Sequence, residues 1–331
     1  MLIKTNAYAR AALIGNPSDG YFGKTISFTF DNFYATVTLW ESPELVILPT
    51  RRDESVFPNI DALANEVQLF GYYGGIRLLK GAIKTFHDYT RKNGIVLDSR
   101  NFTIRYETNI PNLVGLAGSS AIITATYRAL MAFYGVTIPK PELANIIRET
   151  EQTELGISAG LQDRVIQVYE GLVFMDFDKT LIEKQGYGRY EHLDPSLLPP
   201  VYVAYRTDLS EISDVFHNNI KARFNAGEKL VVDAMKFWAD ITDQARAAIE
   251  SGDAATLSRL MDANFDKRAS LYNLSEGNLR MVKAARACGV SAKFTGSGGA
   301  IIGVYEDDAQ FERLRAELAK VSVEVIKPRI V

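Results

Sequence analysis

Alternation of apolar and polar residues predicts that the chain begins with β-strands. Residues 26–41 alternate and are rich in β-branched and aromatic side chains, and a short apolar run follows at 45–49. An earlier alternating stretch, 7–14, ends in a polar turn that begins at Gly15. We therefore expect strands over these three ranges.

The pattern then changes to a helical period over residues 61–93, where Gly71, Gly74 and Gly75 interrupt it. Glycine costs about 1 kcal/mol in a helix interior, so this triplet predicts a bend or a close packing contact. Residues 102–108 alternate again and predict another strand.

A glycine-rich loop at 111–118 leads into a helix that ends at Gly135. Ser119 or Ser120 is expected to cap the start of this helix. Pro141 suits the first turn of a further helix, which we expect to run to about Glu154.

The second half of the chain is mostly helical in pattern. A chain of 331 residues favours two domains, and two prolines followed by a strand at 198–206 place the boundary between 1–195 and 196–331. Helical patterns and strands follow, the helices at 214–250, 254–265, 279–287 and 309–320 and the strands around 292–304 and 321–326.

Composition excludes several classes of protein. Hydrophobic residues make up 47% and charged residues 23%, and the net charge of -3 leaves no basic field for nucleic acid. The apolar runs are too short for a membrane helix, and Lys4 and Arg10 interrupt any signal core. We expect a cytoplasmic protein whose partners include neither nucleic acid nor membrane.

The metal-ligating residues are sparse. A single cysteine, Cys288, excludes an intramolecular disulfide and a thiolate cluster, and the histidines at 87, 192 and 217 have no ligand spacing for structural zinc. None of these histidines lies beside a recognisable nucleophile motif.

Two common phosphate-binding motifs are absent. Gly23-Lys24-Thr25 resembles the end of a Walker A sequence, but Ser18 stands where that motif needs glycine. The segment 295–301 has Ile301 where a dinucleotide fingerprint needs its third glycine.

Three other segments suit an anion. In 111–121, Gly115 and Gly118 allow close approach of the main chain, and the following helix presents free N–H groups. Ser119 and Ser120 add hydroxyls for phosphate or magnesium; the alternative is a turn with serine caps. The other two segments are weaker candidates for an anion site. Tight packing also explains the glycines of 293–300, and an Asx-type turn also explains 15–19.

In this order, the three segments resemble the motifs of the GHMP kinase superfamily. The first runs from Ala9-Arg10 to GNPSD at 15–19, the second is PNLVGLAGSSA at 111–121, and the third is KFTGSGGA at 293–300. Ala117 and Ala300 depart from the usual motifs but leave the backbone donors in place.

Within that superfamily the chain is most similar to the glucuronokinase family over about residues 1–304. The resemblance implies ATP-dependent phosphorylation of the anomeric hydroxyl of D-glucuronate to glucuronate 1-phosphate. It implies a two-domain α+β fold with an active site between the domains. The N-terminal α/β domain would have a mixed sheet with left-handed-crossover topology, and the C-terminal domain would be ferredoxin-like.

The resemblance also implies roles for residues. Asp163 would be the base, and Arg10 would keep it ionised. Mg²⁺ would bind Ser119 or Ser120 and Glu154, with Glu151, three residues earlier on the same helical face, as the alternative. The ATP phosphates would contact Pro111, Gly115, Leu116, Ala117, Gly118, Ser119, Ser120, Ala121, Gly296, Ser297, Gly298 and Gly299.

The sugar would lie against Asn16 and Asp19 of the first motif. A bidentate arginine suits its carboxylate, and spacing does not choose among Lys24, Arg77, Arg164 and Arg223. Two alternatives concern single residues: 151–154 could be a solvated acidic face, and Asp163 could be paired with Arg164 on a helix surface. Two others concern the whole chain: it could be a kinase for another sugar or sugar phosphate, such as a heptose phosphate, or a non-catalytic nucleotide-binding relative.

Overall fold

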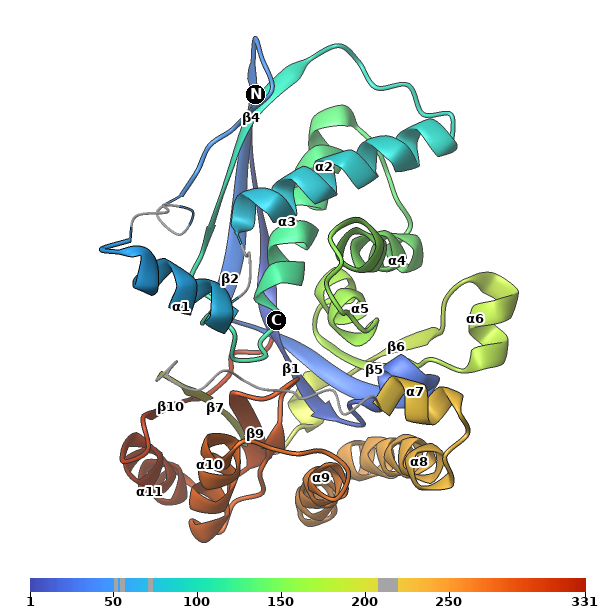
Figure 1. Cartoon of the computed structure of the whole chain (residues 1–331). Helices are drawn as coiled ribbons and strands as arrows, with labels where there is room; N and C mark the ends of the chain where they lie inside the picture. The colour runs from blue at the N-terminus through green and yellow to red at the C-terminus, as the bar shows by residue number, and fades with distance from the viewer. Residues whose placement is uncertain (51–52, 54–56, 71–73, 208–219) are drawn as a thin grey trace. The chain divides into compact units, whose positions relative to one another are not determined.

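The computed structural model describes residues 1–50, 53, 57–70, 74–207 and 220–331 (Figure 1). Gly71 and residues 214–219, which carried helical predictions, lie outside the described residues. The chain forms two compact units: unit 1 is Met1–Ala9, Phe33–Ile110 and Ala117–Val168, and unit 2 is Arg10–Asn32, Pro111–Leu116 and Tyr169–Val331. The chain passes between the units several times, whereas the division predicted after residue 195 is a single cut.

Two long strands, β1 (Leu2–Ile14) and β2 (Lys24–Ser42), contribute to both units. In unit 1, β2 pairs antiparallel with β4 (Asn101–Thr108), which pairs parallel with β3 (Val46–Ile47). In unit 2, β2 pairs antiparallel with β5 (Leu172–Asp176), which pairs antiparallel with β6 (Arg189–Leu193). The pairing is mixed, as predicted. The strand expected over 45–49 is confirmed only at β3, because Pro49 has no N–H to extend the ladder.

The helices of unit 1 are α1 (Ile60–Phe70), α2 (Gly75–Lys92), α3 (Gly118–Tyr134), α4 (Lys140–Glu149) and most of α5 (Gln162–Tyr169). Figure 1 shows α2 and α3 side by side, and Phe86 of α2 packs edge-on against Tyr127 of α3 in the core. A Cβ on Gly75 would overlap the ring of Tyr106, so this glycine serves the predicted close packing.

Unit 2 contains an antiparallel sheet in the order β10-β7-β9-β8. Its strands are β7 (Val201–Arg206), β8 (Lys293–Phe294), β9 (Ala300–Val304) and β10 (Val323–Ile326). Apolar residues of this sheet form one core with α9 (Ala254–Ala269), α10 (Glu276–Ala287) and α11 (Asp308–Ala319). The succession of strand, helices, two strands, helix and strand confirms the ferredoxin-like arrangement.

The remaining elements of unit 2 are η1 (Ser18–Tyr21), α6 (Lys179–Gln185), η4 (Pro195–Leu197), α7 (Ile220–Asn225) and α8 (Lys229–Ser251). The helical pattern predicted over 214–250 is broken after Asn225, where Gly227 adopts a left-handed φ of 72°. Among the described residues, no helix combines the length and the apolar character needed to cross a bilayer.

Candidate active site

The loop before α3 leaves the start of that helix open to an anion. Ala117 is the N-cap residue and provides no side-chain cap, so the predicted cap at Ser119 or Ser120 is wrong. Both serines lie in the first turn, where the Ser120 hydroxyl donates to the Ala117 carbonyl at 3.2 Å. Within the described part of the chain, the N–H groups of Gly118, Ser119 and Ser120 have no acceptor, which suits phosphate oxygens.

Ala117 itself has a strained backbone. Its φ of 63° is left-handed, which costs an ordinary residue about 1–2 kcal/mol. The buried Gln167 amide holds this turn, since its Nε2 donates to the carbonyls of Ala117 and Tyr8, each at 3.0 Å. Sequence reasoning missed Gln167, and no motif or spacing marks it.

In unit 1 a chain of polar contacts joins α3 to α5. The Ser119 hydroxyl donates to Glu151 Oε1 at 2.8 Å, and Arg164 Nε donates to Glu151 Oε2 at 2.5 Å. Arg164 Nη1 donates to the Gly160 carbonyl at 3.0 Å and lies 3.3 Å from Asp163 Oδ2. Both Glu151 and Arg164 are buried, so the arrangement is internally paired and geometrically fixed.

A π-helical turn, η3 (Thr150–Glu154), gives this glutamate its direction. Such widened turns recur at functional sites because they redirect side chains. Glu154, at the other end of the turn, instead pairs with Lys84 of α2 at 2.6 Å and is partly exposed. The structure therefore favours Glu151 over the predicted Glu154 as the carboxylate beside Ser119.

The Ser119 hydroxyl and the Glu151 carboxylate are oxygen ligands of the kind that Mg²⁺ takes. Mg²⁺ is usually held by one or two carboxylates together with substrate phosphates and waters. The described residues contain no group of three or more acidic, histidine or cysteine side chains that could cage a metal alone. The donor set at Ser119 and Glu151 therefore fits Mg²⁺ bound jointly with a phosphate.

In unit 2 the three glycine segments meet. Arg10 is buried, and its Nη1 donates to the carbonyls of Gly115 and Thr295, each at 2.8 Å. A Cβ on Gly115 would lie 2.7 Å from the Gly298 carbonyl oxygen. The contact leaves no room for a side chain at Gly115, which explains the glycine there. Of the other predicted phosphate contacts, Pro111 and Leu116 belong to the same loop, and Gly299 N–H donates to Asn278 Oδ1 at 2.9 Å.

The predicted sugar contacts of the first motif have different surroundings. Asn16 is buried and accepts from Lys293 Nζ at 2.6 Å, so its side chain orders the interior of unit 2. Asp19 is half-buried in η1. Burial first, then the neighbouring Tyr272 and Asp19, raise the pKa of the Tyr21 hydroxyl, which places Asp19 near two tyrosines.

Three of the four cations predicted for the sugar carboxylate already hold a carboxylate of this chain. Lys24 pairs with Asp243 at 2.6 Å, and Arg223 forms two bonds to Glu228 at 2.7 and 2.5 Å. Arg164 is bound to Glu151, and Arg77 donates to the Leu155 carbonyl.

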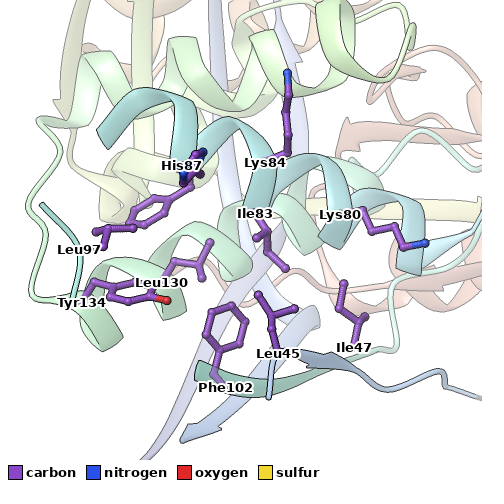
Figure 2. Close-up of a pocket in the computed structure, with 11 residues that line it drawn as sticks. Leu45, Ile47, Lys80, Ile83, Lys84, His87, Leu97, Phe102, Leu130 and Tyr134 are labelled. Atoms are coloured by element: carbon purple, nitrogen blue, oxygen red, sulfur yellow. The ribbon is translucent and has the colours of Figure 1, made fainter. Parts of the chain in front are cut away.

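A pocket of about 400 Å³ lies elsewhere in unit 1 (Figure 2). Its walls are mostly apolar and come from β3, β4, α2 and the end of α3. Leu130 in this wall is twelve residues after Gly118 in α3, about 18 Å along the helix axis at the usual rise. The pocket is therefore separate from the polar chain around Ser119.

Comparison with known proteins places the chain in a family. Residues 77–171 match the model for the GHMP kinases N terminal domain, and 245–323 match GHMP kinases C terminal. Glucuronokinase 1 of Arabidopsis thaliana is 43% identical over 91% of this chain and 84% of that protein. Probable glucuronokinase 2 of the same plant is 41% identical over 97% of this chain and 89% of that protein. The crystal structure of Lactococcus lactis galactokinase complexed with galactose has a TM-score of 0.75 and covers 99% of this chain and 93% of that chain. At 15% identity, this likeness shows the fold alone.

Proposed function

The chain belongs to the GHMP kinase family of phosphotransferases, and on that premise we propose that it transfers the γ-phosphoryl group of ATP to the anomeric hydroxyl of D-glucuronate. The product is glucuronate 1-phosphate. The similarity to two glucuronokinases, at 43% and 41% identity, supports this acceptor. The contact chain from Ser119 through Glu151 and Arg164 to Asp163 carries the chemical part of the proposal.

The phosphates bind at the start of α3 in this proposal. Phosphoryl transfer needs mainly positioning and charge neutralisation. The N–H groups of Gly118, Ser119 and Ser120 supply fixed donors, and the positive end of the helix dipole favours the anion. Ser119 and Glu151 would hold Mg²⁺, which would supply positive charge to the phosphates. Ser120 contributes its N–H rather than its hydroxyl, because that hydroxyl donates to the Ala117 carbonyl.

Asp163 receives the proton of the acceptor. As the anomeric oxygen bonds to the γ-phosphorus, the bond to the β,γ-bridging oxygen breaks and ADP leaves. The hydroxyl proton passes to an Asp163 carboxylate oxygen. Arg164 bonds to both acids and so fixes the distance between the proton acceptor and the metal ligand. General-base assistance of this kind is worth about 10²–10⁴ in rate.

Product analysis tests the proposal. The enzyme is incubated with ATP, Mg²⁺ and D-glucuronate, and ³¹P NMR locates the phosphate. We expect a phosphate on C1, and Asp163→Asn to lower kcat by about 10²–10⁴-fold while ATP still binds. Phosphorylation of a neutral hexose or a heptose phosphate but not of glucuronate would refute the acceptor. Unchanged kcat in Asp163→Asn would refute the base.

A further inference from the structure

Unit 2 contains a buried arginine that forms no direct salt bridge with the described residues. Arg268 of α9 is only 4% exposed, and no carboxylate oxygen of the described residues lies within 4.0 Å of its nitrogen atoms. Burial lowers the pKa of its guanidinium, and the more distant Tyr272 and Asp19 oppose that shift only in part. Removing a cation from water without an adjacent carboxylate is costly, so such a residue calls for a function.

The guanidinium is fixed against the third glycine loop. Its Nη1 donates to the Gly296 carbonyl at 2.8 Å and its Nη2 to the Ser297 carbonyl at 3.3 Å. The rings of Tyr272 and Phe294 each lie 5.2 Å from its central carbon. Stacking and the rigid fork together leave the side chain one orientation.

These bonds determine where the loop's N–H groups point. In a trans peptide the C=O and the following N–H point in opposite directions. Carbonyls of Thr295, Gly296 and Ser297 face Arg10 and Arg268, so the N–H groups of the next three residues face away from both arginines. Over the described residues, the N–H groups of Gly296, Ser297 and Gly298 have no acceptor.

The two ends of the loop are anchored differently. Thr295 N–H donates to the Ala300 carbonyl at 3.1 Å, and Gly299 N–H donates to Asn278 at 2.9 Å. Between these ends, the three peptide groups that join residues 295–298 are held by their carbonyls, and their N–H groups have no acceptor among the described residues. Successive free N–H groups of this kind form a nest for an anion.

We propose that Arg268 is a positioning residue, which acts together with Arg10 to prepare the third glycine loop for the phosphates of ATP. Arg10 turns the N–H group of Gly296 outward, and Arg268 turns those of Ser297 and Gly298 outward. The inference rests on the proposed function for the identity of the anion. The buried amine of Lys293 lies beside the same loop and donates to the Phe294 carbonyl at 2.8 Å. A bound polyphosphate in turn favours the charged forms of Arg268 and Lys293.

Binding measurements without sugar test this role apart from the acceptor. Arg268→Met removes the fork, Arg268→Lys keeps the charge, and Arg246→Met is the control. Arg246 also lies over a ring, that of Phe174 at 4.8 Å, but it donates to Glu250 at 2.9 Å and not to the loop. The dissociation constants of ATP and of inorganic tripolyphosphate are measured by calorimetry, and hydrogen exchange is followed in a peptide covering 294–300.

We expect Arg268→Met to weaken ATP and tripolyphosphate about 10–100-fold, the range for hydrogen bonds to charged groups. Arg268→Lys should recover part of the loss, and Arg246→Met should bind like wild type. ATP should slow exchange of the loop amides in wild type but not in Arg268→Met. Affinity and loop protection in Arg268→Met equal to wild type would overturn the proposal. If Arg268→Met does not fold, Arg268→Lys serves as the test. Wild-type ATP affinity and wild-type protection of the loop amides in Arg268→Lys would show that the guanidinium is not required. A different sugar product would leave these results unaffected.

Discussion

The hydroxyl of Ser119 donates to the carboxylate of Glu151 at 2.8 Å, although 32 positions separate the two residues. This contact distinguishes Glu151 from Glu154 as the carboxylate beside Ser119, which their spacing in the sequence could not do. We expect Glu151→Gln to raise the Mg²⁺ concentration needed for half-maximal activity about 10–100-fold, because a neutral amide is a poor ligand for a hard cation. Initial rates over a Mg²⁺ titration measure the effect.

Glu154→Gln is the matched control for that titration. Glu154 bonds to Lys84 on a partly exposed surface, so its loss should leave the Mg²⁺ dependence unchanged. The reverse ranking would restore Glu154 as the ligand. Thermal melts of both variants detect any loss of stability, because Glu151→Gln also removes the negative charge that pairs with the buried Arg164.

Gly115→Ala tests the close approach of the second and third glycine segments in unit 2. The residue has a φ of 70°, and an added Cβ would lie 2.7 Å from the Gly298 carbonyl oxygen. We expect a loss of ATP affinity as well as stability, because the two loops must separate. Gly135→Ala is the control: its φ is 66° but its Cβ would meet no atom within 4 Å. Backbone strain alone should cost both variants about 1–2 kcal/mol of unfolding free energy. Equal ATP affinity in the two variants would contradict a role for the contact.

Sequence patterns predicted the long strands and helices because their periodicity is local. The alternation at 26–41 lies within β2, and the helix expected after the glycine loop is α3, ending at Gly135 with a φ of 66°. The cap at Ser119 was predicted wrongly because a capping serine and a serine that donates to a distant acid have the same local sequence. The contact with Glu151 depends on the tertiary fold.

Other features of the site leave no pattern in the sequence. Nothing in TEQTE predicts a π-helical turn, so helical spacing could not rank Glu151 and Glu154. Arg268 lies in an ordinary amphipathic helix, and its role depends on carbonyls 28 and 29 residues later. By contrast, Gly115 and Gly118 were recognisable because a loop without side chains is itself a local signal.

A buried hydroxyl network beside the π-helical turn should affect stability. Tyr127 Oη lies 2.7 Å from Thr85 Oγ1 and 3.3 Å from Thr150 Oγ1, and all three residues are buried. We expect Tyr127→Phe to lower the unfolding free energy by about 1–3 kcal/mol, because the threonine hydroxyls lose a partner without access to water. Urea denaturation measures it. Tyr134→Phe, whose hydroxyl bonds to the Arg100 carbonyl at 3.2 Å in a less buried position, should cost less. Equal losses would argue against the network.

The last prediction concerns the charge of Lys293. Its Nζ donates to Ala12, Asn16 and Phe294, and burial first, then the neighbouring Arg268 and Arg10, lower its pKa well below the ordinary value. The unfolded chain therefore binds more protons than the folded one between the two pKa values. Stability of the nucleotide-free enzyme should rise with pH in that interval.

An anion bound at the third glycine loop favours the protonated amine and raises this pKa. ATP binding in alkaline buffer should therefore take up protons, because the arginines stay charged and phosphate groups with a second pKa of about 6 are already ionised. Calorimetry in two buffers of different ionisation enthalpy, at about pH 8.5 to 9.5, measures the uptake. Lys293→Met should bind ATP without it. Equal proton uptake in wild type and Lys293→Met would show that the loop and this lysine are not electrostatically coupled.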